Sequence, residues 1–375
     1  MTTGKKTTFL YLSEEDMIKA GVLDGKQCVE TIEDMFKVVG EGDYLMGGAN
    51  ENEHGQRIYF PVEKRFPNMP VAGPDRRFMS MITYLGGKFN ICAAKWYGSN
   101  IANSQRGLPR SVLVVVLNDV ETGEPLAFMS ANLLSAMRTG AIPAVGAKYL
   151  ASKNATTVAV IGAGVISRAT ITCMKAALPQ LTKAVVYDLY KDKAVAFCNQ
   201  MSQELGFEFV AADSMEEAVR AADVISIAAA GSTPPVIREE WLKPNVLIAS
   251  QGKLSLSDEL FCSSRVVFDE IKMHKAWKEE EDHNPDNQLV KRIGFPGPDV
   301  FRLCAEGKLN EGGISSLSEI TFGKTPGRTK ENERFIMIIG GMPVEDAAWG
   351  WALYHNALKQ GIGKELTLWD SPHWF

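Results

Sequence analysis

Between residues 157 and 270, short apolar runs alternate with segments whose apolar residues recur at helical spacing. Runs of this kind without polar interruption are typical of parallel strands buried on both faces of a sheet. The pattern therefore predicts a doubly wound α/β domain with right-handed crossovers. The predicted strands are TVAVIGAG (157–164), KAVVYD (183–188), FEFVAAD (207–213), DVISIAAA (223–230), NVLIASQG (245–252) and RVVFDE (265–270). The predicted helices among them are 165–178, 191–205 and 214–222, the last opening with a capping box of Ser214 and Glu217.

The first 130 residues follow a different pattern, in which helical spacing comes first and strand-like runs come later. Helices are predicted at 13–21 and 28–39, and strands at 78–86, 89–98 and 111–120, which are rich in β-branched and aromatic residues. Between them, residues 47–74 are rich in Gly, Asn and Pro and show no periodicity, as in a functional loop or a short hairpin. The C-terminal segment 340–361 again has helical spacing, and we expect it to pack on this first part.

Composition narrows the possible functions. The 375 residues, 45% of them apolar, favour two or three globular domains. The net charge of −5 argues against nucleic acid as a partner, because phosphate binding needs a basic excess. No apolar run approaches the roughly 20 residues that span a bilayer, and the N-terminus lacks a signal-peptide core. Six scattered cysteines without a CxxC pair fit the reducing cytoplasm, and five dispersed histidines without HExxH predict no metal site.

A glycine motif follows the first of these apolar strands. It spans Gly162, Ala163, Gly164, Val165, Ile166 and Ser167. Gly162 allows a tight turn, and Gly164 lets backbone N–H groups approach a pyrophosphate at the helix N-terminus. Asp188 ends the next strand, 24 residues after Gly164, where a carboxylate can bind the ribose of NAD. The motif predicts NAD as cofactor. NADP remains possible because Lys191 and Lys193 follow, and the alternative is a turn glycine with a capping aspartate.

Two basic residues lie in apolar surroundings. Lys95 belongs to the predicted strand 89–98, and Arg138 belongs to SANLLSAMRTGA, which we predict to be helical. A buried cation needs a compensating anion. That anion could be an internal carboxylate or the carboxylate of a substrate, and the residues alone leave both interpretations open.

Across nearly its whole length, the chain resembles the ornithine cyclodeaminase/mu-crystallin family. The resemblance is carried by GLPRS (107–111), LNDVETGEPLAFMS (117–130), SAMRTGA (135–141), AKYLA (147–151), VIGAGVIS (160–167) and GMPVEDAAW (341–349). It implies a Rossmann domain, 131–320, inserted between the two parts, 1–130 and 321–375, of a second α+β domain that binds substrate and forms a homodimer. The stretch GGANENEHGQ further resembles a bacterial subgroup that carries a tyramine oxidase label, which supplies no mechanism.

The resemblance also implies site residues. Lys95 and Arg138 would hold the carboxylate of an amino-acid-like substrate, and Thr139 would lie near the cofactor phosphates. The family's strand-end aspartate is replaced in SQGKLSLSDEL by Lys253, which can act as a base only after losing its proton, or can instead pair with Asp258 or face solvent.

In the family, an N-terminal arginine joins the lysine and arginine that hold the substrate carboxylate, and this third cation has no clear match in the N-terminal stretch. Arg57 is the best candidate, ahead of Arg76 and Arg77, and His54 is a candidate substrate contact.

These features together predict an NAD(P)-dependent oxidoreductase acting on the C–N bond of an amino-acid-derived amine or imine. Lys95, Arg138 and Lys253 are the candidate catalytic residues. The alternatives are an ornithine cyclodeaminase that uses NAD catalytically, which the missing aspartate disfavours, and a nucleotide-binding protein without catalysis.

Overall fold

The computed structural model describes residues 4–231, 233–284, 291–292 and 294–374. The chain forms two compact units, each assembled from separate segments of sequence. The first unit comprises Met1–Asp24, Gly42–Ser135 and Met342–Phe375, and the second comprises Gly25–Glu41 and Ala136–Gly341. No helix among the described residues is both long enough and apolar enough to cross a membrane.

The first unit is built on one mixed sheet of eight strands in the order β16-β1-β7-β6-β5-β4-β2, with β3 also paired to β4. Its strands are β1 (Thr7–Leu12), β2 (Tyr44–Met46), β3 (Gln56–Tyr59), β4 (Arg77–Leu85), β5 (Ile91–Ser99), β6 (Ser111–Asn118), β7 (Pro125–Ser130) and β16 (Lys364–Trp369). Its helices are α1 (Glu14–Lys19), α11 (Pro343–Gln360) and a 3₁₀ turn at Ile101–Arg106. The stretch 47–74 therefore contains one short strand, β3, which pairs antiparallel with β4.

Helix α11 covers one face of this sheet. Along β5, residues alternate between buried positions and less buried ones, so Lys95 and Tyr97 share the buried face while Trp96 lies on the other. Helix α11 contacts β4, β5 and β6, and its Trp349 is fully buried. The prediction that the C-terminal helix returns to the first part of the chain is confirmed.

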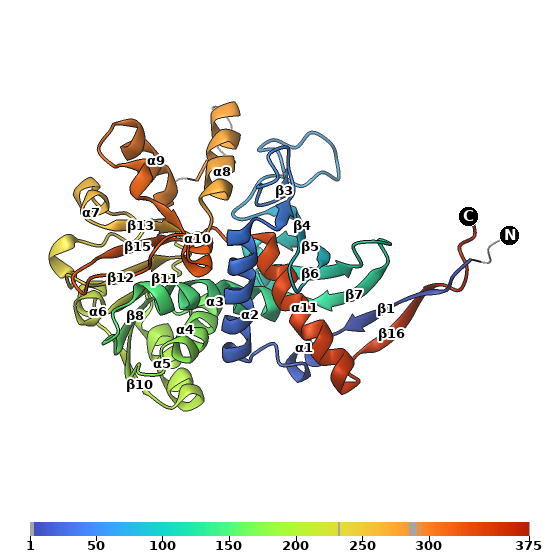
Figure 1. The fold of residues 1–375 in the computed structure, drawn as a ribbon, viewed down its shortest axis with the longest axis horizontal. Coiled ribbons are helices and arrows are strands. Elements are labelled where there is room, and N and C mark those ends of the chain that lie inside the picture. The colour runs from blue at the N-terminus through green and yellow to red at the C-terminus, as the bar shows by residue number, and fades with distance from the viewer. Residues whose placement is uncertain (1–3, 232, 285–290, 293, 375) are drawn as a thin grey trace. The chain divides into compact units, whose positions relative to one another are not determined.

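The second unit contains a fully parallel sheet in the order β10-β9-β8-β11-β12-β15-β13-β14. Its strands are β8 (Thr157–Ile161), β9 (Lys183–Tyr187), β10 (Glu208–Ala211), β11 (Val224–Ile227), β12 (Leu247–Ser250), β13 (Arg265–Phe268), β14 (Ser315–Ser316) and β15 (Phe335–Ile338). Its helices are α2 (Gly25–Glu41), α3 (Asn132–Leu150), α4 (Val165–Ala177), α5 (Lys191–Leu205), α6 (Met215–Ala221), α7 (Asp258–Cys262), α8 (Ile271–His283), α9 (Pro296–Ala305) and α10 (Leu317–Phe322), with 3₁₀ turns at Glu239–Trp241 and Glu311–Gly313. The predicted doubly wound domain is confirmed (Figure 1).

The direction of winding fixes where a ligand can bind. The chain passes outward through β8, β9 and β10 and then returns to β11 and β12 on the other side of β8. At the point where the strand order reverses, the loops after neighbouring strands diverge and leave a crevice at the carboxyl ends of the strands. Ligands of doubly wound folds bind in this crevice. Gly162, Asp188, Gln251, Asp269 and Ile339 each follow directly after one of these strands.

Helix starts in the sequence are reproduced with one difference. The Ser13 side chain accepts a hydrogen bond from the Asp16 N–H, and Ser214 accepts one from Glu217 N–H. The Glu217 carboxylate, however, accepts the N–H of Asp213 at 2.8 Å rather than that of Ser214.

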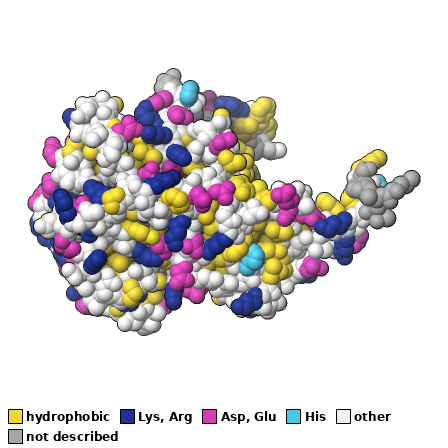
Figure 2. Space-filling view, viewed as in Figure 1, with side chains coloured by type: hydrophobic (Ala, Val, Ile, Leu, Met, Phe, Trp, Pro, Cys, Tyr) yellow, Lys and Arg dark blue, Asp and Glu magenta, His cyan; other side chains and the backbone are white. Residues whose placement is uncertain are grey.

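On the face drawn in Figure 2, the Lys and Arg side chains of described residues are interspersed with Asp and Glu.

Candidate functional site

The glycine loop between β8 and α4 is shaped by two glycines with different roles. Gly162 has φ of +97°, and a Cβ there would lie 3.1 Å from the carbonyl oxygen of Ala228, so only glycine fits without strain. Gly164 is the N-cap of α4, supplies no side-chain cap, and has open space where its Cβ would be. The first N–H groups of α4 are thus uncovered by a capping side chain, which is the arrangement that receives a phosphate.

Asp188 and Ser167 brace this loop from opposite ends. The Asp188 carboxylate accepts N–H groups from Ala163 at 2.8 Å and from Tyr190 at 2.9 Å, one on each oxygen. Ser167 is buried in the first turn of α4, and its hydroxyl donates to the Gly162 carbonyl. Asp188 is half-buried at the end of β9, and the loop and the predicted ribose-binding carboxylate form one hydrogen-bonded unit.

Gln251 is a residue of this region to which no sequence pattern pointed. Its side-chain amide donates to the Thr139 carbonyl at 2.9 Å and accepts from the Thr170 hydroxyl at 3.1 Å. It thereby ties the turn after β12 to both α3 and α4. The buried Arg138 lies one residue before Thr139 on α3, so Gln251 fixes the backbone that carries both residues.

Lys95, on the first unit's sheet, has an internal carboxylate partner. Its ammonium nitrogen lies 3.0 and 3.1 Å from the two carboxylate oxygens of Asp346 on α11, and 2.7 Å from the Ser135 hydroxyl. The Lys95 and Asp346 side chains are only 3% and 2% exposed. The internal ion pair anticipated as one alternative for Lys95 is therefore present.

Lys253 lies in the turn that follows β12 and is partly exposed. Its aliphatic stem lies beside Gly294, where an added Cβ would be 3.4 Å from the Lys253 Cδ. Asp258, the proposed alternative partner of Lys253, is held by Arg302 at 2.7 Å and by Lys308 at 3.6 Å. These cations lower the pKa of Asp258, the Arg302 hydrogen bond being the largest cause.

The N-terminal candidates lie on β3, in the loop before it, and at the start of β4. Arg57 is on β3 and donates from a guanidinium nitrogen to the Tyr59 hydroxyl at 2.7 Å. His54 lies in the loop just before β3 and is partly buried. Arg77 pairs with Asp75, while Arg76 donates to the Val71 carbonyl at 3.1 Å.

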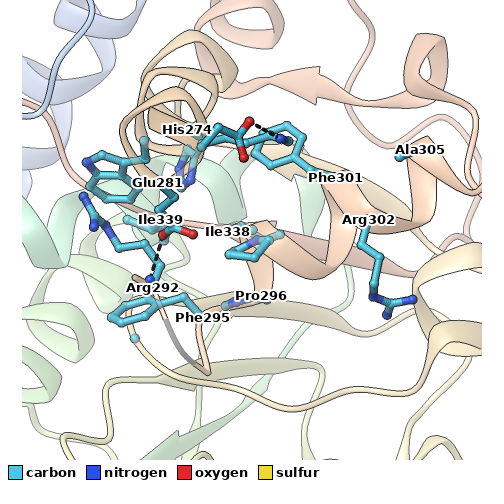
Figure 3. Close-up of a pocket in the computed structure, with 16 residues that line it drawn as sticks. His274, Glu281, Arg292, Phe295, Pro296, Phe301, Arg302, Ala305, Ile338 and Ile339 are labelled. Atoms are coloured by element: carbon cyan, nitrogen blue, oxygen red, sulfur yellow. Dashed lines mark hydrogen bonds and ion pairs between the residues drawn. The ribbon is translucent and has the colours of Figure 1, made fainter. Parts of the chain in front are cut away.

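A pocket of about 340 Å³ lies in the second unit, between α8, α9 and the turn after β12. Figure 3 shows His274 and Glu281 of α8 on one side and Phe301 of α9 across from them, with Ile338 and Ile339 at the end of β15 between. The pocket and its buried residues were not singled out from the sequence.

One buried carboxylate anchors the pocket to the sheet. Asp269, at the end of β13, accepts N–H groups from Gly340 and Gly341, each at 2.7 Å, and lies 2.8 Å from Nε2 of His274. The next residue, Glu270, caps α8 through the Lys272 N–H, and burial raises the pKa of the Glu270 carboxyl despite hydrogen bonds from Ser318 and Ser316. Among the described residues, no three His, Cys, Asp or Glu side chains are placed to hold a metal ion.

Comparison with known proteins identifies the family. The model of the ornithine cyclodeaminase/mu-crystallin family matches residues 24–361. The chain belongs to this family. It is also 27% identical over 364 residues to N-((2S)-2-amino-2-carboxyethyl)-L-glutamate dehydrogenase of Staphylococcus aureus, a match covering 96% of this chain and 98% of that protein.

Solved structures share the fold. Delta(1)-pyrroline-2-carboxylate reductase of Thermococcus litoralis, in complex with NADH and L-proline, superimposes with a TM-score of 0.77 and 27% identity, covering 95% of this chain and 99% of that one. An archaeal alanine dehydrogenase dimer with bound NAD gives a TM-score of 0.75 at 22% identity, covering 97% and 100%. The Rossmann-type fold that the family resemblance implies is thus confirmed.

Proposed function

We propose that the protein is an NAD(P)-dependent oxidoreductase acting on the C–N bond of an amino-acid-derived amine or imine. The observation that carries the proposal is the loop from Gly162 to Ser167, braced by Asp188 at the carboxyl edge of the parallel sheet. Similarity over nearly the whole chain to a dehydrogenase and a reductase of amino-acid derivatives supports the C–N chemistry. We assign the cofactor to the second unit, whose parallel sheet includes β15 (Phe335–Ile338) in addition to strands within the expected 131–320.

The chain's own residues fit a dinucleotide. The uncovered amides at the start of α4 would hold the pyrophosphate, and Thr139 would lie close to the phosphates. Asp188 uses one hydrogen bond per oxygen for the loop, so each oxygen retains acceptor capacity for a ribose hydroxyl. A carboxylate repels a 2′-phosphate, so Asp188 favours NAD over NADP.

The cations would bind and orient the substrate. The bound nicotinamide supplies hydride exchange with the α-carbon. In the proposal, Lys95 and Arg138 hold the substrate carboxylate, with Arg57 as the candidate third cation and His54 as a further contact. Because Asp346 and Ser135 already fix the direction of the Lys95 ammonium, the group is oriented before the substrate arrives. Lys253 or a water molecule would exchange the proton of the amine.

Two other functions are separated by one experiment. Ornithine cyclodeamination would release ammonia without net change in NADH, and a binding protein would do neither. We expect net NADH formation or consumption with a panel of amines and imines derived from amino acids, followed by NADH absorbance and an ammonia assay in parallel. Redox-neutral ammonia release from ornithine would replace the proposal with the cyclodeaminase.

A homodimer is part of the proposal. The sheet face of the first unit opposite α11 carries four exposed apolar side chains, Phe78, Ile82, Trp96 and Val112. The rings of Phe78 and Trp96 stack with their centroids 5.8 Å apart. Exposed apolar patches of this kind mark interaction sites. The archaeal alanine dehydrogenase with the same fold is a dimer. Light scattering should give twice the 41.1 kDa chain mass, and Trp96→Glu should shift it toward the monomer.

A further inference from the structure

His274 presents a ring nitrogen to a pocket whose wall is mainly apolar. The pocket is formed mainly by rings and branched chains, namely Trp277, Phe295, Pro296, Phe301, Ile338 and Ile339. His274 is 5% exposed, and its only hydrogen bond within the described part of the chain joins Nε2 to Asp269. Figure 3 shows the ring of Phe301 across from His274.

The partners of Asp269 decide the role of each His274 nitrogen. The Asp269 carboxylate accepts N–H groups from Gly340, Gly341 and Glu270, so it acts as an acceptor toward His274 as well. The proton of a neutral His274 ring then lies on Nε2, and Nδ1 is left as an acceptor. A ligand in the pocket would meet a mainly apolar wall and the buried acceptor Nδ1 of His274.

The charged side chains that line the pocket already have partners within the chain: Glu281 accepts the Arg292 backbone N–H at 2.7 Å, and Arg302 pairs with Asp258 outside the pocket. Lys278 pairs with Asp282, and Arg292 pairs with Glu280 at 2.9 Å. The Arg292 guanidinium also lies over the Trp277 ring, 4.7 Å from its centre. The Lys278–Asp282 pair is about half exposed, whereas most of the lining consists of rings and branched chains, which favours a neutral, apolar ligand group.

The pocket adjoins the half of the fold that would hold the reacting end of the cofactor. In a doubly wound dinucleotide fold the second mononucleotide half follows the reversal of strand order, here at β11 and β12. Gly252, in the turn after β12, lines the pocket, and the next residue is Lys253. Leu254 N–H donates to the Gly294 carbonyl at 2.9 Å, so this turn is joined to the segment that leads into α9.

We propose that this pocket binds the side chain of the substrate, and that this side chain is an aromatic ring carrying an N–H or O–H donor for His274 Nδ1. The inference rests on the proposed function, because it assigns the pocket to the substrate of that reaction. It names the substrate class: an amine or imine derived from an aromatic amino acid with a ring donor.

Gly297 provides a sharp test of the hydrogen bond. A Cβ added there would lie 3.4 Å from His274 Nδ1 and 3.7 Å from the Phe268 ring, which are ordinary contact distances. Gly297 lies in the first turn of α9 without a positive φ, so alanine fits its backbone. Gly297→Ala should cover Nδ1 while leaving the fold intact. His274→Phe removes the acceptor and keeps a ring.

Direct binding is measured by calorimetry on the whole chain with indole and 1-methylindole, which differ in the ring donor. We expect indole to bind about fivefold more tightly, as one neutral hydrogen bond allows. Both variants should abolish that difference, and Lys275→Ala, exposed on α8 outside the pocket, should preserve it. Equal affinities in the wild type, or an unchanged difference in Gly297→Ala, would overturn the inference.

Turnover separates this inference from the proposed function. With NAD, tryptophan should give a higher kcat/KM than alanine or ornithine, and Gly297→Ala should lower kcat/KM for tryptophan about fivefold without changing the value for alanine. If NADH forms with alanine but not with tryptophan, the inference is overturned and the proposed function still stands. Absence of both NADH binding and turnover would refute the proposed function, and the substrate pocket with it.

Discussion

Lys95 and Asp346 are 251 residues apart in sequence, and their side chains meet at 3.0 Å in a site that is almost closed to solvent. The strand β5 brings the ammonium and the helix α11 brings the carboxylate, so the pair joins the first and last parts of the chain within one unit. A buried ion pair contributes little net stability against apolar replacements, but the loss of one partner leaves an uncompensated charge.

The first prediction follows from that asymmetry. Asp346→Asn should lower the free energy of unfolding by about 3 kcal/mol, and the double variant Lys95→Met/Asp346→Asn should lose less than the sum of the single changes. Urea denaturation of the wild type, Asp346→Asn, Lys95→Met and the double variant measures the coupling energy between the two side chains. The exposed pair of Lys37 and Asp34 on α2 is the control, and its single variants should change stability by less than about 0.5 kcal/mol. Additive effects at Lys95 and Asp346 would show that the pair does not act as a unit.

The second prediction concerns Asp188. NADH should bind more tightly than NADPH, and Asp188→Ala should narrow the difference by removing the repulsion of the 2′-phosphate. Because Asp188 also accepts the Ala163 N–H, the same variant should weaken NADH binding. Fluorescence titration with both nucleotides measures the two effects. Glu216→Ala, which breaks an exposed ion pair with Arg220 on α6, should change neither. Tighter binding of NADPH by the wild type would contradict the assignment.

Local sequence signals predicted the strands and helices well because each depends on neighbours in the chain. The uninterrupted apolar runs of the second unit became buried parallel strands, and Ser13 and Ser214 became N-caps. The helical spacing of 340–361 indicated that this segment packs on the first part of the chain, but no local pattern specifies that Asp346 faces Lys95 on β5. Gln251 escaped notice for a similar reason, since its two partners lie on helices more than 80 residues away.

The third prediction concerns Arg138. If it holds the substrate carboxylate, Arg138→Ala should lower kcat/KM by several hundred-fold, since a lost charged hydrogen-bond partner costs on the order of 2–5 kcal/mol. Arg138→Lys should recover part of the loss by restoring the charge without the planar fork. Lys148→Ala, on the same helix and paired with Glu33, should leave kcat/KM unchanged. A loss below about tenfold in Arg138→Ala would assign Arg138 a structural role.

The fourth prediction concerns stability at acid pH. Asp223 directly precedes β11. Burial alone would raise the pKa of its carboxyl, but hydrogen bonds from Lys243 at 2.7 Å and from the N–H groups of Thr156 and Thr157 outweigh burial. The net effect is a pKa below the usual value. Because the pKa is lower in the folded state, the stabilisation is present above the unfolded value of about 3.9 and is lost as pH falls through the folded pKa.

Asp223→Asn should therefore reduce stability near pH 7 and lessen the further loss on acidification toward pH 3, as measured by urea denaturation across that range. Asp192→Asn, at an exposed position in the first turn of α5, should follow the wild-type curve. Parallel curves for the wild type and Asp223→Asn would show that Asp223 makes no such contribution.

The last prediction concerns Lys253, which stands in the turn after β12, where the family resemblance places an aspartate in cyclodeaminases. An ammonium cannot accept a proton from an amine or from water, so ring closure with loss of ammonia should be slow in the wild type. Ornithine should then give no redox-neutral ammonia release, while a true substrate should change NADH in proportion to its conversion.

Lys253→Asp supplies a carboxylate at the same place and should gain traces of ammonia release from ornithine. Lys253→Ala should lower kcat for the redox reaction if Lys253 exchanges the amine proton, and an unchanged kcat would transfer that role to water. Parallel ammonia and NADH assays of the three proteins decide the matter, with Lys308→Ala, an exposed lysine that pairs with Asp258 and Glu306, as the matched control.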